Sequence, residues 1–286
     1  MELNKVYCMD NLELLNQLTD ESIDLIYCDI LYNTGKKFKD YNDNLGTPQE
    51  AIEWYRPRLI EMKRVLKDSG TIVLQMDYRL VHYMKVEMDK HFNFINHIVW
   101  KRFSPAGGKI KSDGFAKNID DILVFSKTNN FIWNPQYTDF EDKYLKKFKK
   151  DKNGRYFTDQ PLRGISEKKL EQLEKEDRIY ITSVGTKRLK RYLDETNGMP
   201  IDSIWTDIPP VNSQAKEKVG YDTQKPKELL KRIIKAFSNE GDIVADFFCG
   251  SGTSLVVAKE LGRNYMGCDI NPRAIEITNK RLGDIN

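Results

Sequence analysis

Short apolar runs alternate with amphipathic stretches along most of the chain. Buried-strand patterns are expected at 5–8, 23–28, 71–76, 94–100, 119–125, 243–245 and 264–269. Between several of these runs, large apolar side chains recur at helical spacing, which predicts helices at 12–18, 48–67, 78–90, 226–237 and 253–261. Strands that alternate with helices indicate an α/β fold, and we expect a doubly wound, Rossmann-like sheet.

The middle of the chain has a different character. Between residues 141 and 191, 16 Lys/Arg stand against 9 Asp/Glu, so this stretch carries +7 while the whole chain carries only +3. A basic middle on a mildly acidic frame suggests a polyanion as partner, although a solvated lysine-rich helix would give the same charge. We therefore predict one domain built from 1–126 and 200–286, with 127–199 inserted into it.

A glycine-rich turn follows the strand that ends at Asp246. Gly250 and Gly252 would let the backbone approach a ligand without a Cβ in the way, and ligands of open α/β sheets lie at such strand ends. The turn lacks the third glycine of a dinucleotide site and the Gly-Lys-Ser/Thr of a P-loop. About 20 residues later a second strand ends in Asp269, a position suited to ribose hydroxyls.

Other acids also stand at predicted strand ends. Asp10 follows the first strand, where it has two interpretations, a contact to a cofactor or an N-cap of the next helix. Asp77 is expected to cap the helix at 78–90. The polar stretch 35–46 is expected to be a mobile loop near the site, and the basic stretch 104–111 either contacts phosphate or simply connects two strands.

Three segments together resemble the β group of amino-group DNA methyltransferases. Asp29-Ile-Leu-Tyr-Asn-Thr-Gly35 is similar to their catalytic loop, usually Asp-Pro-Pro-Tyr-Asn-Thr-Gly. Thr223-Gln-Lys-Pro226 matches the end of a His-Pro-Thr-Gln-Lys-Pro segment. Asp246-Phe-Phe-Cys-Gly-Ser-Gly-Thr-Ser254 resembles the S-adenosylmethionine turn, usually Asp-Pro-Phe-x-Gly-Ser-Gly-Thr-Thr. The segments follow the β-group order, with the catalytic loop first and the cofactor turn last.

The resemblance implies S-adenosyl-L-methionine as cofactor, double-stranded DNA as substrate and residues 127–199 as a target-recognition insert. Asp29 and the carbonyl of Ile30 would accept the two N–H groups of a flipped-out base, and Tyr32 would stack on that base beside Leu31. No metal is needed. The expected cofactor-binding residues are Asp10, Thr223, Gln224, Lys225, Pro226, Asp246, Phe248, Cys249, Gly250, Ser251, Gly252, Thr253 and Asp269.

Adenine N6 is the expected target, because an acid opens the catalytic loop. Cytosine N4 and RNA are alternatives. So is a DNA- or cofactor-binding relative with impaired catalysis, because Ile30 and Leu31 replace two prolines that would fix the backbone after Asp29. The resemblance also departs at Tyr221-Asp222 and at Phe247.

The remaining features concern compartment and partners. The four cysteines, Cys8, Cys28, Cys249 and Cys268, form no metal-binding spacing and are expected to be reduced core residues, which fits a cytoplasmic protein. The N-terminus shows no secretion signal, and no apolar run approaches the length of a membrane span. A cognate restriction endonuclease and a homodimeric state are possible partners that the sequence does not decide.

Overall fold

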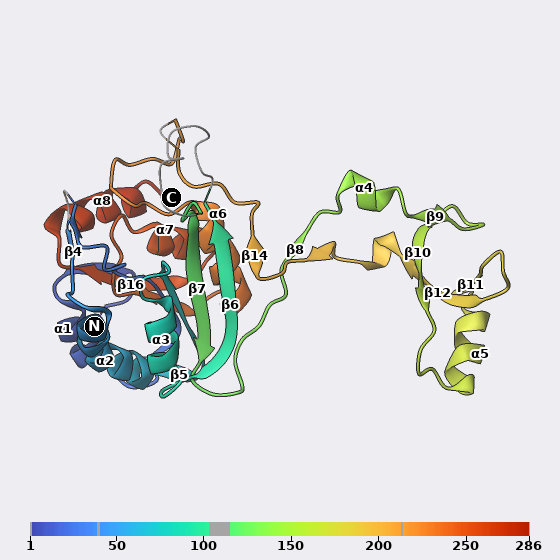
Figure 1. The fold of residues 1–286 in the computed structure, drawn as a ribbon, viewed down its shortest axis with the longest axis horizontal. Coiled ribbons are helices and arrows are strands. Elements are labelled where there is room, and N and C mark those ends of the chain that lie inside the picture. The colour runs from blue at the N-terminus through green and yellow to red at the C-terminus, as the bar shows by residue number, and fades with distance from the viewer. Residues whose placement is uncertain (1, 39–40, 103–114, 213, 286) are drawn as a thin grey trace. The chain divides into compact units, whose positions relative to one another are not determined.

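The computed structural model describes residues 2–38, 41–102, 115–212 and 214–285. The chain forms two compact units (Figure 1). The larger unit consists of Met1–Asn134 and Asp202–Asn286, and the smaller unit consists of Pro135–Ile201. The basic stretch at 104–111 lies outside the described residues, so its expected role is not addressed below.

The larger unit is built on a sheet that has eight strands in the described part of the chain. Their order is β1 (Lys5–Cys8), β16 (Asn264–Asp269), β15 (Ile243–Asp246), β2 (Ile23–Asp29), β5 (Leu66–Met76), β7 (Ile119–Ser126), β6 (Asn93–Lys101) and β14 (Ile204–Trp205). Neighbouring strands pair in parallel except on the two sides of β7. Strand β7 therefore runs against all the others.

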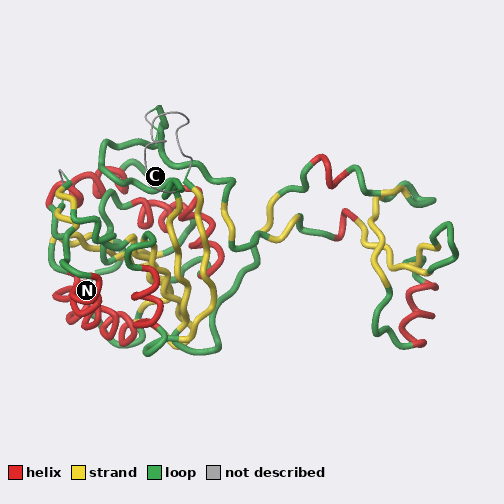
Figure 2. Tube along the Cα trace, in the orientation of Figure 1, coloured by secondary structure: helices red, strands yellow, loops and turns green. Residues whose placement is uncertain are grey.

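Helices cover both faces of this sheet, as Figures 1 and 2 show. One layer contains α1 (Asn11–Gln17), α2 (Pro48–Val65) and α3 (Val81–Met88), and the other contains α6 (Lys227–Phe237), α7 (Thr253–Glu260) and α8 (Pro272–Gly283). The expected doubly wound α/β architecture is confirmed. Among the described helices, none is both long and apolar enough to cross a membrane.

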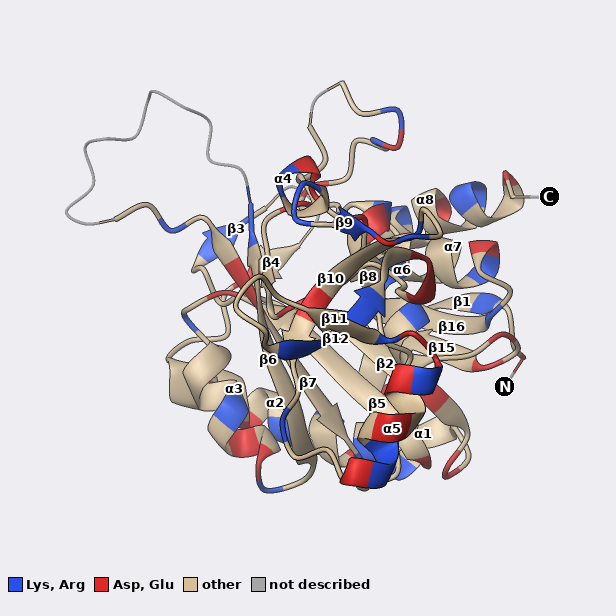
Figure 3. Cartoon of the chain, turned by 90° about the vertical axis from the view of Figure 1, so that its right-hand side faces the viewer, with Lys and Arg blue, Asp and Glu red and all other residues tan. Residues whose placement is uncertain are grey.

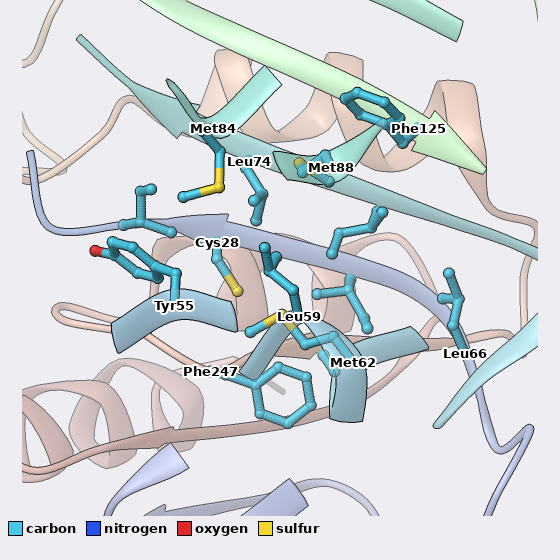
Figure 4. Packing of buried hydrophobic residues seen from close by; sticks show 14 of the residues in the cluster. Cys28, Tyr55, Leu59, Met62, Leu66, Leu74, Met84, Met88, Phe125 and Phe247 are labelled. Atoms are coloured by element: carbon cyan, nitrogen blue, oxygen red, sulfur yellow. The ribbon is translucent and has the colours of Figure 1, made fainter. Parts of the chain in front are cut away.

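The main core lies between the sheet and the layer formed by α1, α2 and α3 (Figure 4). Ile26 and Cys28 of β2 and Leu74 of β5 belong to this core. Leu25 and Val73 are equally buried but lie outside this cluster, because successive side chains of a strand point to opposite faces. Phe247, which replaces a proline of the family pattern, is 1% exposed and packs in the same core (Figure 4).

Several boundaries differ from the sequence-based expectations. Helix α2 begins at a capping box formed by Thr47 and Glu50 and ends at Val65, because Leu66 already enters β5. Asp77 does not provide the N-cap of α3, which is Leu80; its carboxylate instead accepts a hydrogen bond from the backbone N–H of Arg79 at 3.0 Å. The expectation that Asp77 caps this helix was therefore wrong.

The polar stretch after the catalytic-loop motif is not simply a loop. It contains a short hairpin of β3 (Lys36–Lys37) and β4 (Asn42–Asp43), with residues 39–40 outside the description. Cys28, Cys249 and Cys268 are buried free thiols, as expected, but Cys8 is exposed. It ends the edge strand β1, so no second neighbouring strand covers it.

The smaller unit contains two antiparallel sheets. In one, β8 (Tyr137–Thr138) pairs with β13 (Met199–Pro200). The other has the order β11 (Ile179–Ile181), β12 (Lys187–Tyr192), β10 (Tyr156–Pro161) and β9 (Lys149–Lys150). The remaining elements are α4 (Asp142–Leu145), α5 (Glu167–Lys175) and a 3₁₀ turn at Leu193–Glu195.

Part of the positive charge of the smaller unit is balanced within the unit itself. Arg155 pairs with Asp194 at 2.7 Å and with Glu195 at 2.9 Å, and Arg178 also pairs with Glu195. Residues of both signs alternate along α5 (Figure 3). The net charge of +7 over 141–191 is therefore an excess over these pairs rather than a uniform basic face.

Candidate active site

The centre of the larger sheet is a topological switch point. Strands β15 and β2 are neighbours and pair in parallel, with Val244 opposite Leu25 and Ala245 opposite Ile26. From β2 the chain passes through α2 to β5 on one side, and from β15 it passes through α7 to β16 on the other. The crevice at the carboxyl ends of two such strands is where doubly wound folds bind ligands.

A cavity of about 1210 Å³ opens at this edge of the sheet. Its walls include most of the side chains expected to be functional: Asp10, Asp29, Ile30, Leu31, Tyr32, Thr223, Gln224, Lys225, Asp246, Phe248, Cys249, Gly250, Ser251, Thr253 and Asp269. Pro226 and Gly252 are not on its walls. Pro226 precedes the first turn of α6, and Gly252 packs against α8.

The glycine-rich turn has a conformation that depends on its two glycines. Gly250 and Gly252 have φ values of +49° and +70°, which side chains rarely adopt. The Gly250 N–H donates to Asp269 Oδ2 at 2.9 Å, which ties the turn to the end of β16. A Cβ on Gly252 would lie 2.3 Å from Cγ2 of Thr278 in α8.

Helix α8 supports the turn from below, and the sequence analysis did not anticipate it. Arg281 is 9% exposed, and its Nη1 donates to the carbonyl of Ser251 at 2.5 Å and to Thr253 Oγ1 at 3.0 Å. Asn271 caps this helix and Pro272 occupies its first turn, a sequence signal that would have identified its start.

Asp246 is a buried acid at the end of β15. It is 2% exposed, and its carboxylate accepts hydrogen bonds from the Phe248 N–H at 3.0 Å and from the Ser254 hydroxyl. Burial raises the pKa of Asp246 to about 7, although the hydrogen bond from Ser254 lowers it in part. A cation bound beside this carboxylate would favour its ionised form.

Asp29 ends the adjacent strand β2 and joins two of the sequence motifs. Its Oδ2 is paired with the ammonium group of Lys225, 196 residues away in the chain, and its Oδ1 accepts from the Tyr32 hydroxyl at 2.9 Å. Burial raises the pKa of Asp29, and the charge of Lys225 opposes that shift. The catalytic-loop motif and the Thr-Gln-Lys-Pro segment thus meet at one carboxylate.

The two residues that replace the family's prolines have defined hydrogen bonds. The N–H of Ile30 donates to the carbonyl of Gln75 at 3.1 Å, extending the pairing of β2 with β5 by one residue. The carbonyl of Leu31 accepts from the hydroxyl of Tyr55 at 3.1 Å. A proline at position 30 has no N–H and would lose the first of these bonds.

The following residues of the loop are held by Asp43 of the β3–β4 hairpin. This carboxylate is 1% exposed, and it accepts from the backbone N–H groups of Asn33 at 2.9 Å and of Thr34 at 3.0 Å. The Asn33 side chain in turn binds the backbone of Leu45 and Gly46. Backbone contacts on both sides of Tyr32 therefore provide the restraint that two prolines would otherwise supply.

Asp10 combines the two interpretations that its position allowed. Its Oδ1 accepts from the Leu12 N–H at 2.8 Å and so caps α1, and the residue also lines the cavity. Its carboxylate is paired with Arg58 at 3.1 Å. The Arg58 guanidinium lies 3.4 Å from the centre of the Trp54 ring, another residue of the cavity wall.

Comparison with known proteins places this site in a family. The DNA methylase (N6_N4_Mtase) family profile matches residues 23–280. The chain is 30% identical over 315 residues to the type II methyltransferase M.EcaI of Enterobacter cloacae, covering 98% of this chain and 69% of that protein. It is 28% identical over 280 residues to the DNA adenine methyltransferase YhdJ of Escherichia coli (strain K12), covering 96% and 80%.

A solved structure supports the fold. TTHA0409 of Thermus thermophilus, a DNA modification methylase in complex with S-adenosyl-L-methionine, superposes with a TM-score of 0.58 at 18% identity and covers 98% of this chain and 93% of that chain. The resemblance of the three motifs is thereby confirmed at the level of the family. The chain belongs to the N6/N4 DNA methylase family, whose members use S-adenosyl-L-methionine to methylate amino groups of DNA bases in restriction-modification systems.

Proposed function

We propose that this chain methylates the N6 amino group of adenine in double-stranded DNA. The carrying observation is that the carboxylate of Asp29 stands at the switch point, on the wall of the cavity that the glycine-rich turn also lines. An acid at this position can accept an N–H of an adenine amine. The similarity to the adenine methyltransferase YhdJ supports the same choice over cytosine N4.

The chain's own residues would act on the target amine rather than on the methyl group. The lone pair of an exocyclic amine is delocalised into the ring, and hydrogen bonds from both N–H groups to Asp29 and to the Ile30 carbonyl localise it. The Tyr32 ring stacks on the base, which must leave the duplex to enter the cavity. The new C–N bond forms as the C–S bond breaks, and the amine then releases one proton.

The cavity residues fit S-adenosyl-L-methionine, which supplies an electrophilic methyl group when bound. Gly250 leaves space beside the turn, where a Cβ would approach the Tyr221 ring to 3.3 Å. Asp246 would hold the cofactor's positive methionine end, and Asp269 and Asp10 its ribose and base. Thr223, Gln224 and Lys225 form the wall nearest Asp29, while Pro226 and Gly252 act by shaping the backbone.

The smaller unit would read the target sequence. Its excess of basic residues over acids suits contact with phosphates, and its exposed aromatic side chains, such as Tyr156 and Tyr137, suit contact with bases. A cognate restriction endonuclease and a homodimer stay predictions.

Digestion of DNA incubated with the protein and S-adenosyl-L-methionine, followed by mass spectrometry of the nucleosides, tests the proposal. N6-methyladenine is the expected product. N4-methylcytosine as the product, methylation of RNA alone, or no product would contradict it. Asp29→Ala is the matched variant: it should abolish transfer but leave cofactor binding, measured by calorimetry, nearly unchanged.

A further inference from the structure

The hydroxyl of Tyr32 lies between two carboxylates. Its oxygen is 2.9 Å from Asp29 Oδ1 and 2.9 Å from Asp120 Oδ2. One hydroxyl has one proton, so it can donate fully to only one of these acceptors at a time. Burial and the two nearby carboxylates raise the pKa of Tyr32 well above its usual value, so the hydroxyl keeps that proton.

Asp120 is fixed in place by the sheet. It is 1% exposed, lies on β7 and faces the cavity. Its Oδ2 also accepts from Gln75 Nε2 at 2.9 Å, and Gln75 Oε1 accepts from the Tyr27 hydroxyl at 2.8 Å. Its Oδ1 lies 3.3 Å from Arg102 Nε. A carboxylate held by neighbouring strands in this way is a rigid anchor for a side chain in the cavity.

The two oxygens of Asp29 are used differently. Oδ2 is paired with Lys225, so Oδ1 is the oxygen that an incoming amine can reach, and Oδ1 is the one that Tyr32 contacts. For the amine to bind, Tyr32 must give up Asp29 Oδ1. Without a second acceptor, that step would leave a buried hydroxyl unpaired and release the ring, at a cost typical of breaking a buried hydrogen bond.

We propose that Asp120 is a positioning residue that takes over the Tyr32 hydroxyl when the target amine binds Asp29. Asp29 Oδ1 is then freed while the ring that stacks on the base stays anchored. This inference rests on the proposed role of Asp29 toward a base amine. It assigns Asp120 no contact with the base or with the cofactor.

The test compares kcat, KM for DNA and cofactor affinity for the parent, Asp120→Ala, Tyr32→Phe and the double variant. Asp120→Ala should lower kcat about 10- to 100-fold, as expected for a misplaced group, and leave cofactor affinity unchanged. The effects of Asp120→Ala and Tyr32→Phe should not multiply in the double variant, because both remove the same hydrogen bond. Independent, multiplying effects would overturn the proposal, and so would a fully active Asp120→Ala.

Two further variants make the test sharp. Both hydrogen bonds to Asp120 enter Oδ2, so the amide oxygen in Asp120→Asn can still accept them, and this variant should keep kcat within a few-fold of the parent. If kcat falls as far in Asp120→Asn as in Asp120→Ala, the hydroxyl is not what Asp120 serves. Asp121→Asn is the matched control: it is the adjacent buried acid, 5% exposed, but it pairs with His97 at 2.7 Å and does not line the cavity.

The product of the parent protein, determined beforehand, separates the two proposals. A parent that makes N4-methylcytosine would contradict adenine specificity, yet the Asp120 variants could still be compared on that product. A parent that makes N6-methyladenine with unaffected Asp120→Ala kinetics would contradict only the role of Asp120.

Discussion

Asp29 and Asp246 end neighbouring parallel strands, yet their carboxylates are stabilised in different ways. A lysine ammonium compensates for the burial of Asp29, whereas hydroxyl and backbone N–H groups alone hold Asp246. The pKa of both acids is raised by burial, and that of Asp246 reaches about 7. This difference suits an acceptor that works on a neutral amine next to an acid that receives a cationic ligand.

Cofactor affinity should therefore depend on pH through Asp246. Below about pH 7 this acid is protonated and neutral in the free protein, and above it the acid is ionised. Because a positive ligand favours the ionised acid, the Kd for S-adenosyl-L-methionine should fall as pH rises from 6 to 8, by up to about tenfold per pH unit below the pKa. Calorimetry over this range is the measurement. In Asp246→Asn this dependence should be absent, and a flat profile in the parent would remove Asp246 from contact with the cofactor's charge.

Ile30 illustrates how a single residue departs from a family pattern without leaving an unpaired group. Its N–H is used by Gln75, so returning a proline there removes a buried hydrogen bond. We expect Ile30→Pro to lower the free energy of unfolding by about 1–3 kcal/mol and to give no gain in rate. Leu31→Pro is the comparison, because Leu31 binds Tyr55 through its carbonyl, which proline keeps. Chemical denaturation and kcat measurements would reveal the opposite result, a faster or more stable Ile30→Pro.

At the scale of elements, the turn before α7 depends on its contact with α8. Gly252 combines a φ of +70° with a Thr278 side chain where its Cβ would stand. Backbone strain and steric overlap add here, and neither can be relieved by moving a flexible side-chain end, since the overlap reaches Cβ of Thr278 at 2.8 Å.

Gly252→Ala should thus destabilise the protein by more than about 1 kcal/mol and weaken cofactor binding. Gly283→Ala provides the control, because Gly283 lies in α8 with no atom near its added Cβ and should be neutral or slightly stabilising. Thermal melts with and without S-adenosyl-L-methionine measure both effects. Equal melting temperatures for the two variants would show that the turn tolerates a side chain.

The sequence predicted these elements unevenly, for physical reasons. Strands β1 and β16 were predicted with their observed bounds because both are short, apolar and bounded by polar residues. Asp43 and Asp120 were missed because their importance comes from partners distant in the chain: Asp43 looked like one more polar residue, and Asp120 like an acid beginning a strand. The pairing of Asp29 with Lys225 was accessible only through family resemblance, since no local pattern links residues 196 positions apart.

On the scale of the whole molecule, the larger unit contains every described residue of the cavity wall. Cofactor binding and DNA recognition are thus expected to separate, with the second depending on the smaller unit. Lys146 and Lys147 of that unit follow α4 and are exposed. They are candidates for contact with phosphates.

Replacing both lysines by alanine should weaken DNA binding and lower the slope of log K against log salt by about one for each phosphate that is no longer neutralised. Cofactor affinity should stay at the parental value. Lys5→Ala is the control, since Lys5 begins a parallel strand and so stands at the sheet edge opposite the cavity. Fluorescence anisotropy at several salt concentrations measures the slope, and an unchanged slope would remove these lysines from the DNA interface.

The central position of β15 has a consequence for how the protein is made. Asp24 accepts a hydrogen bond from the N–H of Ile243 at 2.9 Å, so the middle of the sheet joins residues separated by 219 positions. During translation, β2 leaves the ribosome long before its neighbour exists. The newborn polypeptide must wait for nearly all of its length before the cofactor crevice can close, so ribosome-bound fragments would have no access to the methyl donor and would leave the host genome unmarked.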